Sequence, residues 1–178
     1  GLLALDWHNG NRTILVDTML SGLVLGKTLN TRPEEMFKAL IEATAFGCLK
    51  IINQIEKYKI KITEIIAIGG LAKSPLIMQV YADITGRKIK TLKSDQVCAV
   101  GAAILASISN NRGFNNFNSI QKKMSVKTKK VYKPQPKNNK IYLKLFKLYS
   151  NIHDAFGIQG KPIELYHVMK DLIRLRDN

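Results

Sequence analysis

Apolar side chains recur at intervals of three and four positions from Pro33 to about Tyr58, which is typical of a helix with one face on a core. Pro33 suits the first turn of this helix, and we expect Thr31 to cap it with Glu34 completing a capping box. The positions that form the apolar face are Phe37, Leu40, Ile41, Ala45, Cys48, Leu49, Ile52 and Ile55. The pattern therefore predicts a long amphipathic helix over residues 33–58.

A continuous β-branched run from Ile65 to Ile68 ends at a glycine pair, which predicts a strand buried on both faces of a parallel sheet. Ser74 and Pro75 then begin a second helix, which Gly86 ends. A short strand over residues 88–92 and a small-residue helix over residues 97–109 follow. This alternation of strands and helices predicts an α/β fold class with mostly parallel strand pairing.

The pattern becomes irregular after residue 109, where Asn, Lys and Gly are frequent and a Pro-containing segment follows. We interpret residues 110–136 as a basic extended linker. Two further helices are predicted over about residues 137–154 and 162–175. The expected organisation is a body of residues 1–109 and a carboxy-terminal helical appendage of residues 137–178.

The net charge of +15 is concentrated in residues 110–153, which carry eleven basic residues and no acidic one. Only Arg112 among these is an arginine, whereas readers of bases and phosphates favour the guanidinium group. We interpret the segment as a lysine-rich solvated surface. The alternative is a nucleic-acid-binding module that uses residues 110–153.

Gly69 and Gly70 lie where a predicted strand meets the start of a helix, and glycines there let the backbone approach a nucleotide base or ribose. Such a pair also occurs in tight connections without a ligand. The sequence contains neither a phosphate-binding loop of the Gly-x-x-x-x-Gly-Lys-Ser/Thr type nor a Gly-x-Gly-x-x-Gly dinucleotide fingerprint. The pair alone is a weak indication of a nucleotide site.

The acidic residues are interpreted as structural. Asp83 and Asp95 lie on a predicted helix and in a turn, where caps and ion pairs are common. His153 and Asp154 have neither a nucleophile nor a metal-ligand partner at a useful spacing. The Asp6–Arg12 loop contains a tight-turn signal that could direct polar groups into a cleft, although we favour a structural role. We therefore predict no catalytic residue and no metal ligand within this chain.

Several segments together closely resemble the FGGY carbohydrate kinases: Gly69-Gly70-Leu71-Ala72-Lys73-Ser74-Pro75, Met78-Gln79, Ala82-Asp83, Gly86, Ser94-Asp95-Gln96 and Ala99-Val100-Gly101-Ala102-Ala103. Other segments are similar to ribulokinases within that family, namely Asp6-Trp7-His8-Asn9-Gly10-Asn11-Arg12, Glu42-Ala43-Thr44-Ala45-Phe46-Gly47 and His153-Asp154-Ala155-Phe156-Gly157. The resemblance covers nearly the whole chain.

The resemblance implies an actin-like, ribonuclease-H-like ATPase fold, of which residues 1–109 are an incomplete nucleotide-binding lobe. It implies that the lobe binds ATP, with Mg²⁺ held mainly through the phosphates, and that the catalytic carboxylate belongs to an amino-terminal lobe outside this chain. The residues carried over as nucleotide contacts are Gly70, Leu71 and Ser74, with Gly69 and Ala72 shaping the turn. Seven residues separate Gly70 from Met78, the spacing of glycerol kinases, whereas ribulokinases often have one more.

The expected function is therefore the ATP-binding part of a ribulokinase-like enzyme that phosphorylates ribulose, inactive without its other lobe. The alternatives are an FGGY kinase of the xylulose or glycerol type, and a standalone nucleotide-binding protein whose partner chain supplies the second lobe. No run of about 20 apolar residues and no signal peptide is present, so we expect a soluble cytoplasmic protein that is not associated with membranes. An exposed sheet edge would favour homo-oligomers.

Overall fold

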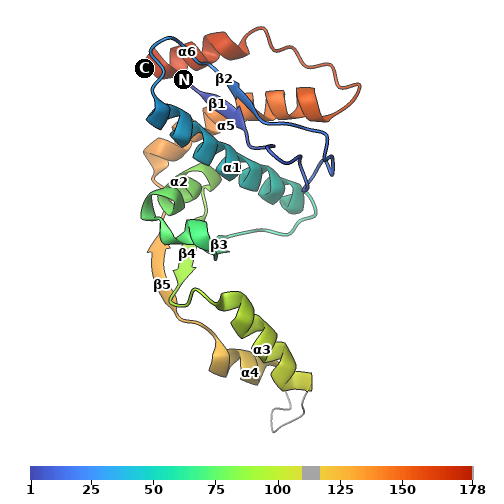
Figure 1. Cartoon of the computed structure of the whole chain (residues 1–178), viewed down its shortest axis with the longest axis vertical. Coiled ribbons are helices and arrows are strands. Elements are labelled where there is room, and N and C mark those ends of the chain that lie inside the picture. Colours follow the sequence, from blue (N-terminus) through green and yellow to red (C-terminus); the bar gives the residue numbers. More distant parts are fainter. Residues whose placement is uncertain (110–116, 178) are drawn as a thin grey trace.

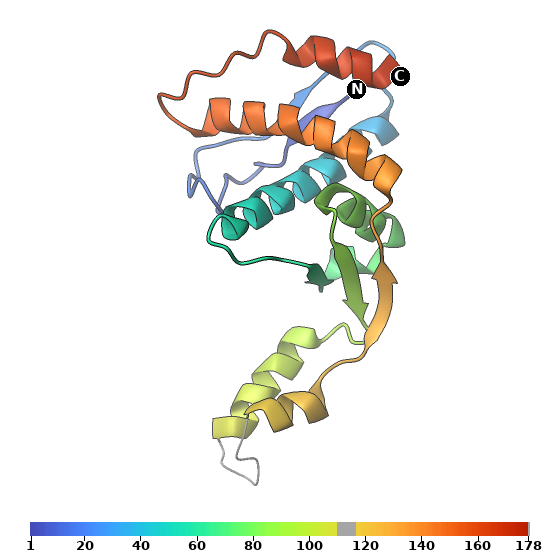
Figure 2. The same ribbon diagram turned by 180° about the vertical axis from the view of Figure 1, so that it is seen from behind.

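The computed structural model describes residues 1–109 and 117–177. Figures 1 and 2 show a body in which helices and a two-stranded sheet pack together, with a second small sheet below it. A narrow projection formed by α3 (Val97–Ser109) and α4 (Phe117–Met124) extends from that second sheet. No helix in the described ranges is long and apolar enough to cross a membrane.

The body is organised around the predicted long helix, α1 (Pro33–Glu56). The antiparallel strands β1 (Leu3–Leu5) and β2 (Leu23–Leu25) lie against it, with Ala4 opposite Val24. The helix α5 (Pro136–Gly157) packs against the same core. The buried residues of this core include Leu3, Leu5, Trp7, Phe46, Leu49, Leu148, Tyr149 and Ile152.

The start of α1 confirms the predicted position of Pro33 but not the predicted cap. Arg32, in an extended conformation, is the N-cap, and its amide donates to Glu35 Oε2 at 2.8 Å. The hydroxyl of Thr31 instead accepts from the amide of Thr28 at 2.8 Å. Proline disfavours helical geometry in the residue before it, so the boundary falls at Arg32 and the cap shifts by one position.

The second sheet has the order β3-β4-β5, formed by Glu64–Ala67, Lys88–Leu92 and Thr128–Tyr132. The first pair is parallel and the second is antiparallel. The α/β class is confirmed, but the expectation of mostly parallel pairing is wrong. The chain reaches β5 after the α3–α4 projection and re-enters the sheet in the opposite direction, which makes the sheet mixed.

The β3 strand is not buried on both faces as expected. Ile66 is 56% exposed and Ile68 is 49% exposed. Within the described residues β3 pairs only with β4, and α2 (Pro75–Thr85) packs on this small sheet from one side only, with Met78 and Ala82 buried against Ile89. One face and one edge of β3 are therefore left uncovered by the part of the chain that the structure describes.

The segment expected to be an extended linker contains regular structure. Helix α4 and strand β5 both fall within residues 110–136, whereas residues 110–116 lie outside the described part of the chain. The expected appendage is likewise integrated with the body, because α5 contributes several side chains to its core. Helix α6 (Val168–Asp177) begins six positions later than expected, and its residues Val168 and Leu172 join the same core.

Candidate functional site

The glycine pair lies between the end of β3 and the short 3-10 helix η1 (Gly70–Lys73), which leads directly into α2. Gly69 has φ +88° and ψ −169°, a conformation that only glycine adopts without strain. A Cβ built on Gly69 or on Gly70 would meet no atom of the described residues within 4 Å. The backbone of this turn is therefore open to close approach by a flat ligand.

The other three predicted contacts lie in the same turn. Leu71 is 56% exposed and presents an apolar side chain at the surface. Ala72 packs against the buried cluster between α2 and the second sheet, and its amide donates to the Gly69 carbonyl at 3.2 Å. Ser74 caps α2 by accepting from the Ile77 amide at 3.4 Å. The structure thus places all five predicted residues in one turn, where Ala72 and Ser74 have local structural contacts.

A second segment is connected to the turn by an ion pair of Asp95, a residue expected to be a cap or an ion-pair partner, whose partner the sequence did not identify. Lys73 Nζ lies 2.9 Å from Asp95 Oδ2, which joins η1 to the loop between β4 and α3. The hydrogen bond from Lys73 lowers the pKa of the exposed Asp95 carboxyl. The two residues belong to different elements, and no spacing rule pairs them. The contact brings the Ser94–Gln96 motif beside the glycine turn.

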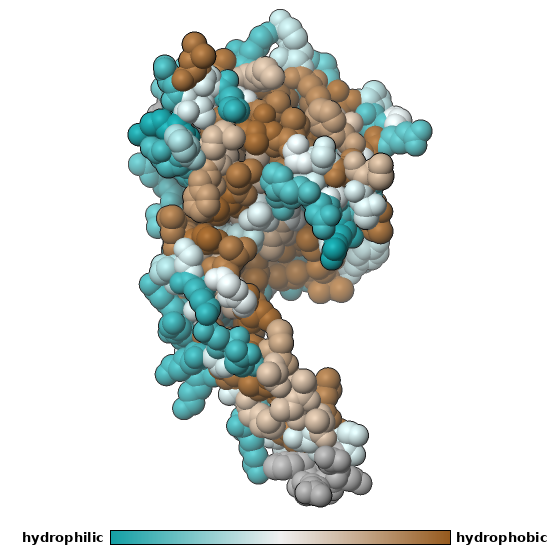
Figure 3. Space-filling model, in the orientation of Figure 1, coloured by the Kyte–Doolittle hydropathy of each residue, from teal (hydrophilic) through white to brown (hydrophobic). Residues whose placement is uncertain are grey.

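The small residues of α3 would allow a neighbouring backbone to approach closely, but no described residue does so at Gly101. A Cβ on Gly101 would meet no atom within 4 Å among the described residues. Its residues Ala99, Ala102 and Ala103 are exposed, and Leu105 is 63% exposed. In Figure 3 the projecting part of the molecule carries apolar surface in tan and brown. Helices this apolar are normally buried, so this face lacks a partner among residues 1–109 and 117–177.

The other polar residues singled out from the sequence have structural contacts. The buried Asp83 carboxylate accepts from Gln79 and Asn138 at 2.8 Å. Although burial opposes it, hydrogen bonds from Lys161, Lys50 and His153 lower the pKa of Asp154. Burial lowers the pKa of His153, whose ring lies against Trp7. These contacts agree with the structural interpretation of Asp83 and of the His153–Asp154 pair.

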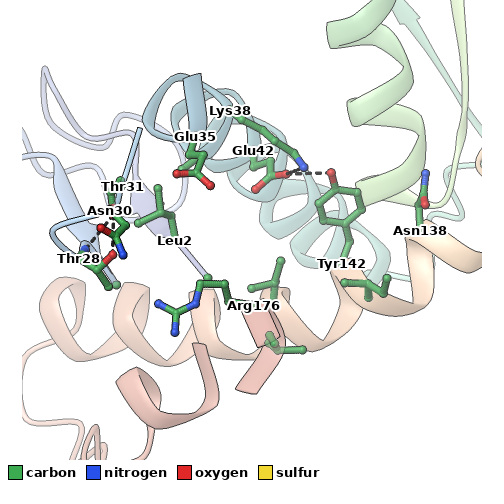
Figure 4. A pocket seen from close by; sticks show the side chains of 16 residues that line it. Leu2, Thr28, Asn30, Thr31, Glu35, Lys38, Glu42, Asn138, Tyr142 and Arg176 are labelled. Atoms are coloured by element: carbon green, nitrogen blue, oxygen red, sulfur yellow. Dashed lines mark hydrogen bonds and ion pairs between the residues drawn. The ribbon is translucent and has the colours of Figure 1, made fainter. Parts of the chain in front are cut away.

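A cavity of about 830 Å³ lies elsewhere, between α1, α5 and α6, and none of the five predicted residues lines it. Figure 4 shows Glu42 at its wall, accepting from the Tyr142 hydroxyl at 2.8 Å, with Lys38 Nζ 3.6 Å away. Burial raises the pKa of the Glu42 carboxyl. In the described residues no three His, Cys, Asp or Glu side chains are grouped so that they could hold a metal ion.

The model of the FGGY family of carbohydrate kinases, C-terminal domain, matches residues 1–109. The chain belongs to this family. It is 47% identical over 161 residues to a ribulokinase of Anoxybacillus flavithermus, covering 88% of this chain and 28% of the relative. It is 44% identical over 181 residues to the ribulokinase of Bacillus licheniformis, covering 99% of this chain and 32% of the relative. This chain thus spans about a third of the length of these relatives.

Solved structures of FGGY kinases are also similar to it. A ligand-bound xylulose kinase from Lactobacillus acidophilus has a TM-score of 0.78 at 30% identity, covering 89% of this chain and 32% of that one. A gluconate kinase from the same organism has a TM-score of 0.77 at 30% identity with the same coverage. These matches support the ATPase-lobe fold that the FGGY resemblance implied.

Proposed function

We propose that this chain is the nucleotide-binding part of a kinase that transfers the γ-phosphoryl group of ATP to a hydroxyl of ribulose. The observation that carries the proposal is the 47% identity to a ribulokinase over most of the chain. The xylulose and gluconate kinases of known structure are 30% identical, which favours ribulose over their sugars. No comparison supports the nucleic-acid alternative for residues 110–153.

In this proposal the adenosine of ATP binds at the glycine turn. The bare backbone at Gly69 and Gly70 gives a flat surface to the base and ribose, and Leu71 adds apolar contact. The Lys73–Asp95 ion pair holds the neighbouring loop against the turn. Ala72 and Ser74 support the turn through their packing and capping contacts.

The sugar, the catalytic carboxylate and part of the sheet belong, in this proposal, to polypeptide outside this chain. The open face of β3 and the unpartnered face of α3 are the surfaces that such polypeptide would cover. Mg²⁺ would be bound by phosphate oxygens and by that other part, since the described residues offer no group of three ligands. The chain supplies ATP recognition and the reaction takes place in the cytoplasm, where ATP is available.

The nucleotide site is tested by titrating the chain with a fluorescent ATP analogue and competing with unlabelled ATP. We expect saturable binding that Gly70→Val weakens at least about tenfold, because its side chain would hold the base away from the backbone. Leu143→Val, on the exposed face of α5, is the control and should bind as the parent does. Equal binding by all three proteins would place the nucleotide elsewhere.

Turnover is tested by ADP release with ribulose. The isolated chain should release no ADP in response to the sugar, and clear sugar-dependent turnover by it would refute the proposed division of roles. Mixing it with the amino-terminal part of the Anoxybacillus flavithermus ribulokinase, cut where the match begins, should restore ribulose-dependent ADP release. The Gly70→Val chain should fail to restore it.

A further inference from the structure

A second cavity, of about 520 Å³, lies between the loop that follows β1 and the helices α1 and α5. Its wall includes the carboxylate-bearing Asp6, the aromatic residues Trp7, Tyr81 and Tyr149, and Gly47 in the middle of α1. The hydroxyl of Tyr81 is already engaged, since it donates to Thr44 Oγ1 at 2.8 Å. Asp6, Trp7 and Tyr149 differ from Tyr81 in having polar atoms that are not fully hydrogen-bonded within the described residues.

Tyr149 is 0% exposed, yet its hydroxyl has no hydrogen-bond partner among the described residues. The indole N–H of Trp7, which is 2% exposed, also has none in that part of the chain. Asp6 is half-buried, and its carboxylate accepts a hydrogen bond from its own backbone and lies near His8, which leaves it further acceptor capacity on the cavity side. Buried polar groups are nearly always paired, so two groups on one cavity that have no partner in the described part of the chain require an explanation.

Gly47 lies beside these groups. A Cβ at this position would be 3.6 and 3.7 Å from the two carboxylate oxygens of Asp6 and 3.7 Å from Tyr149 Oη. These are ordinary contact distances, so alanine would fit without a clash. A glycine inside a helix costs about 1 kcal/mol relative to alanine. Since packing within the described residues does not require this glycine, its effect is to keep a space open between Asp6 and Tyr149.

The chemistry of the three groups restricts what fits that space. A carboxylate only accepts hydrogen bonds, an indole N–H only donates, and a tyrosine hydroxyl does both. An ammonium group would satisfy Asp6 but offers no acceptor to Trp7. A hydroxyl group donates and accepts, and the aromatic walls can pack on the C–H face of a sugar or sugar alcohol.

We propose that this cavity binds a small polyol, with one ligand hydroxyl between Asp6 and Tyr149 over Gly47. That hydroxyl donates to the Asp6 carboxylate and accepts from Tyr149, and a neighbouring ligand oxygen accepts from the Trp7 indole. The site is built from the loop that follows β1 and from α1, α2 and α5, whereas the glycine turn belongs to η1. The inference does not rest on the proposed kinase activity.

The test uses the whole chain and ribitol, with the fluorescence of Trp7, the only tryptophan, as the readout. We expect a saturable change for the parent. Gly47→Ala fills the space and Tyr149→Phe removes one hydrogen bond, so each should weaken ribitol binding at least about tenfold. Tyr142→Phe removes a hydroxyl that bonds Glu42 in the other cavity and should leave binding unchanged.

Thermal unfolding separates loss of binding from loss of structure. Gly47→Ala should melt at or above the parent temperature because alanine is the better helix former. Three results would each overturn the proposal: no saturable response of the parent to ribitol, equal affinity of the parent and the Gly47→Ala chain, or a response to methylammonium in place of ribitol. The last would identify Asp6 as a cation site.

Discussion

The carboxylate of Asp83, on the last turn of α2, accepts a hydrogen bond from the backbone amide of Gln135 at 2.8 Å. Gln135 is the N-cap of α5, so a side chain from one helix satisfies an amide at the start of another. The side chain of Asn139 strengthens this junction by donating to the Asp83 carbonyl at 2.7 Å. The junction fixes where the carboxy-terminal third of the chain rejoins the body.

Asp83→Ala should therefore destabilise the chain by about 2–3 kcal/mol, because the change leaves three part-buried donors without their acceptor. Urea unfolding followed by circular dichroism measures the difference. Asp95→Ala is the control, since its carboxylate is exposed and it should leave the unfolding midpoint almost unchanged. A midpoint for Asp83→Ala equal to that of the control would mean that the junction contributes nothing to stability.

Stability should also depend on the ionisation of Glu42. Burial raises the pKa of this carboxyl, so between its unfolded-state value and the higher folded-state value the folded protein binds more protons. The contribution of Glu42 to the free energy of unfolding is therefore fully present below the unfolded-state pKa and is lost as pH rises through the folded-state pKa. Glu42→Gln keeps an acceptor for the Tyr142 hydroxyl but does not ionise.

We expect the melting temperature of Glu42→Gln, relative to the parent, to be higher at pH 7 than at pH 4. Melting curves at several pH values measure this difference. A constant offset across that range would show that Glu42 does not titrate differently in the folded and unfolded chains.

Gly69 and Gly70 differ in backbone conformation, so we expect alanine to have different effects on stability at the two positions. Gly69→Ala should cost about 1–3 kcal/mol, because a side chain is strained at φ +88°. Gly70→Ala should change stability little, because Gly70 does not have a positive φ and the space around it is open. Chemical denaturation of both variants measures the contrast. Equal stability of the two would indicate that the Gly69 conformation relaxes without cost.

The unpartnered apolar surface should cause the isolated chain to associate. Light scattering during size-exclusion chromatography should show a concentration-dependent mass, which Ile66→Lys combined with Leu105→Lys reduces toward that of the monomer. Leu143→Lys is matched for exposure but lies on α5, and it should leave the association unchanged. A monomeric parent at all concentrations would contradict the prediction.

Local sequence signals predicted most elements well. The spacing of apolar residues located α1 and α5 closely, and Ser74 and Gly86 bound α2 as predicted, with Gly86 at φ +65°. These predictions succeeded because caps and periodicity act over a few residues. The start of α6 was predicted at about Pro162, a residue type that suits the first turn of a helix, but the helix begins at Val168.

The sequence by itself determined α1, α2, α3 and α5, the glycine turn and, through its motifs, membership of the FGGY family. Only the tertiary structure decided that β5 pairs antiparallel with β4, that Lys73 meets Asp95, and that Gly47 lies beside Asp6 and Tyr149. Helix and turn signals depend on neighbours along the chain. Strand partners and cavity walls depend on which surfaces meet after the chain has folded, and residues far apart in sequence carry no local record of that contact.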